Sequence, residues 1–137
     1  MEAERYRCEI IREGVLPVLV DNTWGAHRLS ARLYGRYGLV SLIVGRPLLR
    51  DLFDLSSRTL RTPPTDCDRL RIEQWLDLAT KSKDKLLLLV PCSDRARDEV
   101  KRFAHVLESH FIILEPTSVL SFFSPSTDLD ERYPERL

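Results

Sequence analysis

Four continuous apolar runs, separated by segments with helical periodicity, constrain the fold of this chain more than any other feature. They cover Val15–Val20, Leu39–Val44, Leu86–Val90 and Phe111–Leu114. A strand buried on both faces has this continuous apolar pattern, whereas a half-buried strand alternates apolar and polar residues. Such strands are typical of parallel sheets that helices cover on both faces, so the runs predict neighbouring parallel strands.

Three segments between these runs have apolar residues three and four positions apart, as amphipathic helices do. Their apolar stripes are Ala26, Leu29, Leu33 and Tyr37; Ile72, Trp75, Leu76 and Ala79; and Ala96, Val100, Phe103 and Leu107. Gly38 is placed to end the first helix, Asp66 or Asp68 to cap the second, and Ser93 to cap the third. A weaker strand is expected at Ser57–Arg61 and a weak helix at Val119–Phe123.

The order of these elements predicts a three-layer α/β/α domain, Rossmann-like, with a mostly parallel sheet of about five strands. We expect the domain to span residues 15–123. Residues 1–14 are interpreted as a polar lead-in, and residues 124–137 as a linker or tail. Trp75 lies on the inner stripe of the second helix, so its side chain is expected to be buried.

The composition argues against several classes of protein. The 21 basic residues balance 21 acidic residues, which disfavours a nucleic-acid-binding protein and favours association, for example in a homodimer. The apolar runs are too short to span a membrane, and residues 1–12 do not have the pattern of a signal peptide. Three cysteines without C-x-x-C spacing indicate reduced thiols and a cytoplasmic protein.

Ligands of parallel sheets lie beyond the carboxyl ends of the strands, so the loops after the first and fourth strands are the candidate substrate-binding sites. The first loop contains Asp21, Asn22, Thr23, Trp24 and Gly25. Its free amides at a helix start could bind a phosphate or carboxylate, although it lacks a dinucleotide or Walker motif. The simpler interpretation is a capped turn with Asp21, Asn22 or Thr23 as the N-cap. Trp24 is either a platform for a ligand or a lid on the core.

The second loop contains Cys92, Ser93 and Asp94. A cysteine near a helix start can have a depressed pKa, but no histidine follows nearby to serve as its base. We therefore prefer a structural turn in which Ser93 is the N-cap and Asp94 interacts with the helix dipole. The same dipole and capping terms account for Asp98 and Glu99. No residue is assigned a catalytic role.

The remaining charged side chains are interpreted as structural. His27, His105 and His110 lack metal-ligand spacing, so they are expected to be surface or core histidines and no metal site is predicted. Arg28, Arg32 and Arg36 form one row on the first helix, which is typical of a solvated face. A contact face for an acidic partner is the alternative for that row.

The strand at Pro17–Val20, the helix ending at Leu33–Gly38 and the strand at Ser41–Gly45 together resemble the start of ATP-grasp carboxylate–amine ligases of the D-aspartate ligase type. Leu86–Asp94, an apolar strand that runs into Pro-Cys and then an aspartate, is similar to the second hallmark of that group. The resemblance covers Val15–Pro116. It implies the pre-ATP-grasp domain, which precedes the catalytic ATP-grasp module in the family.

By this resemblance the whole ligase would use ATP and magnesium, held by an ATP-grasp domain or subunit that is the expected partner of this chain. The chain alone is expected to bind neither and to be inactive. Its two loops would face a small amine or carboxylate substrate. Where relatives have glycines after the first strand, this chain has Asp21 and Asn22, which narrows backbone approach. A free-standing small-anion binding module and a structural or dimerisation domain are the alternatives.

Overall fold

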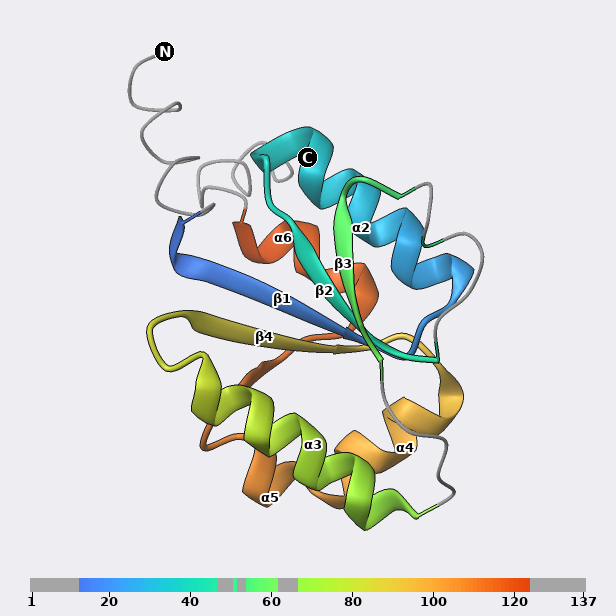
Figure 1. Cartoon of the computed structure of the whole chain (residues 1–137), viewed down its shortest axis with the longest axis vertical. Helices are drawn as coiled ribbons and strands as arrows, with labels where there is room; N and C mark the ends of the chain where they lie inside the picture. Colours follow the sequence, from blue (N-terminus) through green and yellow to red (C-terminus); the bar gives the residue numbers. More distant parts are fainter. Residues whose placement is uncertain (1–12, 47–50, 52–53, 62–66, 124–137) are drawn as a thin grey trace, which may run out of the picture.

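A five-stranded, all-parallel sheet forms the centre of the protein (Figure 1). The computed structural model describes residues 13–46, 51, 54–61 and 67–123. The strands are β1 (Val15–Val20), β2 (Ser41–Gly45), β3 (Ser57–Arg61), β4 (Leu86–Pro91) and β5 (Ile112–Ile113). Their order in the sheet is β3-β2-β1-β4-β5. The predicted fold class and the neighbouring parallel arrangement of the four apolar runs are therefore confirmed.

Helices cover both faces of the sheet, which gives the three layers. One face packs against α2 (Trp24–Tyr37) and α6 (Val119–Phe123), which follows a short 3-10 turn at Pro116–Ser118. The other face packs against α3 (Asp68–Lys81), α4 (Asp94–Arg102) and α5 (Ala104–Leu107). The division follows from the strand order, because right-handed crossovers leading to opposite sides of β1 place their helices on opposite faces.

Each face of the sheet has its own hydrophobic core, and successive side chains of the middle strands point alternately into one core and the other. Val18, Val20 and Leu89 face α3 and α4, whereas Leu19 and Leu88 face α2. All five are fully buried, as expected for central strands of a covered parallel sheet. The side chain of Trp75 is 1% exposed in the core under α3, so its predicted burial is confirmed.

The helix ends agree with the sequence at three of four positions. Thr23 and Ser93 cap α2 and α4, and Gly38 ends α2 in the left-handed conformation with φ of 68°. The prediction for α3 was wrong for Asp68, because Cys67 occupies the cap position without a side-chain bond and Asp68 lies in the first turn. Asp66, the other candidate cap, lies outside the described residues.

Further predicted boundaries differ from the structure. Of the strand expected at Phe111–Leu114, only Ile112–Ile113 forms β5. The strand expected at Leu39–Val44 begins only at Ser41, because the amide of Leu39 bonds to the carbonyl of Leu33 and closes the end of α2. The third helix is divided in two at Phe103, whose φ of −112° and ψ of 19° interrupt the helical ladder. Within the described ranges, no helix is both long enough and apolar enough to cross a membrane.

Candidate functional site

The loops that follow β1 and β4 meet at the carboxyl edge of the sheet (Figure 1). This is the point where the strand order reverses, since the chain continues from β1 to β2 on one side and reaches β4 on the other. The Thr23 hydroxyl donates to the carbonyl of Cys92 at 3.2 Å. The Ser93 hydroxyl donates to the carboxylate of Asp21 at 2.7 Å. The two loops that the sequence singled out are therefore joined to each other.

The same two hydroxyls also cap the helices that begin in these loops. Thr23 accepts a bond from the amide of Ala26 at 3.1 Å, and Ser93 accepts one from the amide of Ala96 at 3.0 Å. Each hydroxyl thus donates across the site and accepts from its own helix. This double use fixes both side chains as structural supports and leaves neither as an activated nucleophile.

A buried ion-pair network, which the sequence did not predict, joins α3 and α4 to the loop after β1. Arg71 from α3 donates two bonds to Glu99 from α4, at 2.8 and 2.7 Å, and a third to Asp21 at 2.8 Å. Glu99 is fully buried and Arg71 is 8% exposed. Burial raises the pKa of Glu99 above its ordinary value, against the opposing effect of the bonds from Arg71. Glu99 is therefore a buried partner of Arg71, and the interpretation of it as a helix-start charge was wrong.

Cys92 is not an activated thiol. Burial, followed by the negative charge of Asp21, raises the pKa of Cys92 to about 12, and only the charge of Arg97 acts in the opposite direction. A depressed pKa at this position, considered from its place near a helix start, is contradicted. A thiol with this pKa stays protonated at neutral pH and serves as a part-buried neighbour of the loop.

A second polar cluster joins the start of α2 to the segment before β3. One ring nitrogen of His27 contacts Asp54. The other ring nitrogen lies 2.9 Å from Asn22 and 2.9 Å from Asp51. Asn22 also donates to Asp51 at 3.1 and 3.0 Å and to the carbonyl of Arg46 at 2.9 Å. His27 is therefore a core histidine with a full set of partners, as expected, although the sequence did not identify the partners.

Asp54 accepts several hydrogen bonds in this cluster. It accepts bonds from the amide of Ser56 at 2.8 Å and from the Ser57 hydroxyl at 2.9 Å, in addition to His27. Burial acts to raise the pKa of Asp54, but the bonds from Ser56, His27 and Ser57 together outweigh it and lower the pKa. The cluster therefore holds an ionised carboxylate at neutral pH and anchors α2 to the chain before β3.

Of the residues in the predicted site, Trp24 and Asp94 are exposed. Trp24 is 63% exposed, so it is not a lid on the core. Asp94 is fully exposed and 3.1 Å from Arg97. Gly25 leaves room for a side chain, since an added Cβ would come no closer than 3.7 Å to Thr23. The close backbone approach occurs instead at Gly45, where a Cβ would lie 2.8 Å from the amide nitrogen of Asn22.

The arrangement is thus a rigid edge with a small exposed surface of Trp24 and Asp94. Among the described residues, no three histidine, cysteine or acidic side chains gather in a way that could hold a metal ion. The loops can position a ligand or a partner domain, but their polar side chains are committed to one another.

Comparison with known proteins gives no relative on which to base an assignment. No family model, no curated protein and no solved structure matches this chain.

Proposed function

We propose that the chain acts as the pre-ATP-grasp domain of an ATP-dependent carboxylate–amine ligase. Its carboxyl edge would form one wall of the pocket for the acceptor substrate. The proposal is supported by the resemblance of the strand and loop segments to that family and by the parallel sheet that links them. The catalytic half, with ATP and magnesium, would be supplied by an ATP-grasp domain or subunit.

The observation that carries this proposal is the mutual bonding of the two loops at the switch point, beside the exposed ring of Trp24. A wall that must align a substrate with chemistry on another domain needs fixed loops, because small displacements of a substrate reduce rates strongly. The bonds between Thr23 and Cys92 and between Ser93 and Asp21 provide that rigidity without any catalytic group.

The charges at this edge favour an amino acid or a related amine as the substrate. The exposed carboxylate of Asp94, which pairs with Arg97 at 3.1 Å through one oxygen, has its other oxygen open to an ammonium group. The start of α2 has no acidic residue in its first turn, and Arg28 lies close to Gly25, which suits a carboxylate. A ligand with both groups would complement the carboxylate of Asp94 and the start of α2.

A titration of the isolated chain tests the proposal. We expect Mg-ATP to bind no more tightly than about a millimolar dissociation constant. Amino acids should change the fluorescence of Trp24, and Trp24→Phe should remove that change while the signal of buried Trp75 remains. Micromolar binding of Mg-ATP would contradict the proposal that a separate ATP-grasp domain or subunit binds the nucleotide. Silence towards all the amino acids, in calorimetry as well as fluorescence, would contradict the acceptor wall.

A structural or dimerisation domain is the second candidate. It is favoured by the closed bonding of the loops, because Asp21, Asn22, Thr23 and Ser93 all have partners within the chain. Sedimentation of the chain at several concentrations separates the two. A stable dimer that ignores amino acids would favour this candidate over the acceptor wall.

A further inference from the structure

The sheet opens at its amino edge, on the side opposite to the candidate site. β1 pairs with β4 along its whole length, from Val15 to Val20, but it pairs with β2 only from Val18 onward. Figure 1 shows β1 and β2 converging at the carboxyl edge and separating toward their amino ends. A gap therefore remains between the first residues of β1 and the start of β2.

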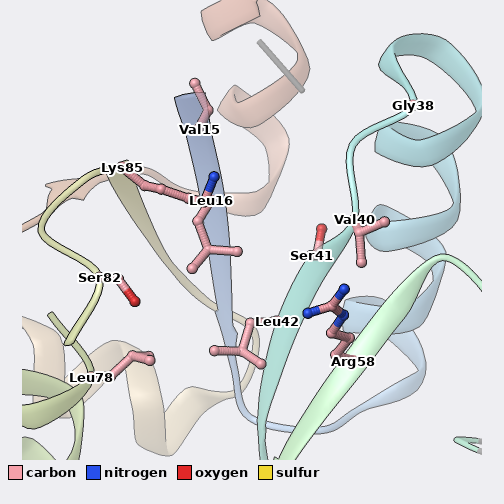
Figure 2. A pocket seen from close by; sticks show the side chains of 10 residues that line it. All are labelled: Val15, Leu16, Gly38, Val40, Ser41, Leu42, Arg58, Leu78, Ser82 and Lys85. Carbon is pink, nitrogen blue, oxygen red and sulfur yellow. The ribbon is translucent and has the colours of Figure 1, made fainter. Parts of the chain in front are cut away.

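A pocket of about 390 Å³ occupies this opening and extends to the end of α3. Figure 2 shows the side chains of Leu42 and Leu78 directed toward each other from β2 and α3, with Leu16 of β1 above them in this view. These three leucines form an apolar floor. The volume lies in the range of pockets that hold small organic ligands.

The polar lining of the pocket is cationic. Arg58 lies on one side and Lys85 on the other, as Figure 2 shows, and no described residue that lines the pocket has a carboxylate. Lys85 donates to the carbonyl of Glu13 at 2.7 Å, which holds its ammonium group near the start of β1. The end of α3 at Ser82 adds partial negative charge, but two full positive charges exceed the half charge of a helix dipole.

We propose that this pocket binds a small organic carboxylate with an apolar body. The carboxylate would lie between the Arg58 guanidinium and the Lys85 ammonium group, and the body would cover Leu16, Leu42 and Leu78. A guanidinium binds a carboxylate through two parallel hydrogen bonds, which favours a carboxylate over a neutral headgroup. The apolar floor favours a chain or ring over a small inorganic anion, which would leave the leucines exposed to water.

This site is independent of the proposed acceptor wall. The pocket residues lie at the amino ends of the strands, whereas Trp24 and Asp94 lie beyond the carboxyl ends. Binding here would therefore occur whether or not the chain belongs to a ligase. A test that follows each edge by its own residues separates the two proposals.

Octanoate is a suitable probe, with octylamine and butyrate as matched comparisons. We expect octanoate to shift the backbone amide resonances of Leu16, Leu42, Arg58 and Ser82 in a two-dimensional NMR titration, with a dissociation constant of about a millimolar or below. Octylamine should bind at least about tenfold more weakly because it places a cation between two cations. Butyrate should also bind more weakly, because it covers less of the apolar floor.

Arg58→Gln tests the headgroup contact in a side chain that is exposed, so the fold should be retained. We expect it to weaken octanoate about tenfold, whereas Arg32→Gln on the exposed face of α2 should leave the affinity unchanged. Equal affinity of the two variants, equal binding of octylamine, or no shift of these resonances up to roughly ten millimolar octanoate would each overturn the proposal. Shifts confined to Trp24 and Asp94 would overturn it too, while leaving the acceptor wall intact.

Discussion

The two edges of the sheet are built on opposite principles. At the carboxyl edge, polar side chains from α3, from α4 and from the loops after β1 and β4 bond to one another, and Glu99 is buried completely. At the amino edge, β1 and β2 separate and leave a pocket with two cations and a buried hydroxyl, that of Ser41, without a hydrogen-bond partner among the described residues. The comparison indicates that the carboxyl edge is closed by bonds between its own side chains, whereas the amino edge has a pocket lined by Arg58 and Lys85.

Arg71→Ala at the carboxyl edge should lower the free energy of unfolding more than any other variant proposed here. It removes the cation that donates two hydrogen bonds to buried Glu99 and leaves, among the described cations, only the longer contact with Arg95 at 3.5 Å. Removing one partner of a buried ion pair is expected to lower the free energy of unfolding by about 3–5 kcal/mol. Arg69→Ala on the same helix is the control, since its pair with Glu73 is exposed and worth less than about 1 kcal/mol. Urea unfolding of both variants gives the answer. Similar losses in the two would show that the network contributes little.

Gly45→Ala should have the next largest effect. The new Cβ would lie 2.8 Å from the backbone nitrogen of Asn22, so the end of β2 or the loop after β1 must shift. We expect a loss of about 1–3 kcal/mol in urea unfolding. Gly25→Ala is the matched control, because its Cβ fits and alanine favours the helix, so stability should stay unchanged or rise by up to about 1 kcal/mol. The reverse order of the two variants would contradict the close approach at Gly45.

Ser93→Ala removes one hydroxyl from the closed edge. It deletes the cap of α4 and the bond to Asp21, and we expect a loss of about 1 kcal/mol, or slightly more, in the free energy of unfolding. Thr80→Ala provides a control, since its hydroxyl bonds to the carbonyl of Leu76 within the same helix, on an exposed surface. Denaturant midpoints compare the two, and a neutral Ser93→Ala would mean that neither bond supports the loop.

A smaller effect should appear only in acid. The hydrogen bond from Arg102, supported by one from Glu99, lowers the pKa of Asp68 from 3.8 to about 2. The unfolded chain therefore binds a proton before the folded chain does as the pH falls through this window, and stability decreases with it. Asp68→Asn should flatten the decrease in urea midpoint between these pH values, whereas Asp77→Asn on the exposed face of α3 should not. Parallel acid curves for all three proteins would exclude this contribution.

Ser41→Ala should have the smallest effect and sharpens the contrast between the edges. The hydroxyl is buried and has no hydrogen-bond partner within the described ranges, so its removal relieves an unmet hydrogen bond. We expect stability within about 0.5 kcal/mol of the parent, or slightly above it. Thermal unfolding beside Ser93→Ala makes the comparison direct. A loss as large as that of Ser93→Ala would reveal a partner for Ser41 and make the amino edge as closed as the other.

The fold was predictable because its signals are local. Runs such as Leu86–Val90 are apolar at every position, and this property alone places them inside a covered sheet. The N-caps Thr23 and Ser93 are likewise set by residue type next to a periodic segment. The position of both loops beyond the carboxyl ends of the strands followed from the general rule for parallel sheets, but the bonds between the loops were not predicted.

The ion-pair network was not predicted because its partners are far apart in sequence. Arg71 is one position before the apolar stripe of α3, and Glu99 is one position before Val100 in the stripe of α4. Opposite charges beside two inward stripes are the signal that could have revealed the pair. His27 was similarly isolated in sequence, and only the chain path after β2 brings Asp51 and Asp54 to its ring.

The pocket could not be read from the sequence at all. Its existence depends on the register by which β1 pairs with β2 from Val18 and with β4 from Val15, and no local pattern records this difference. Arg58 and Lys85 are ordinary surface cations in the sequence. They line one pocket because β1 and β2 separate toward their amino ends.

The pairing of β1 with β4 also has a consequence for how the chain acquires its structure. Val15 is paired with Leu86, so one edge of β1 stays uncovered until β4, from the second half of the chain, pairs with it. Contacts of such sequence separation slow folding, because a long loop must close before they form. A nascent chain that ends before β4 would present β1 as an open, fully apolar edge, the kind of surface that chaperones bind and that promotes aggregation.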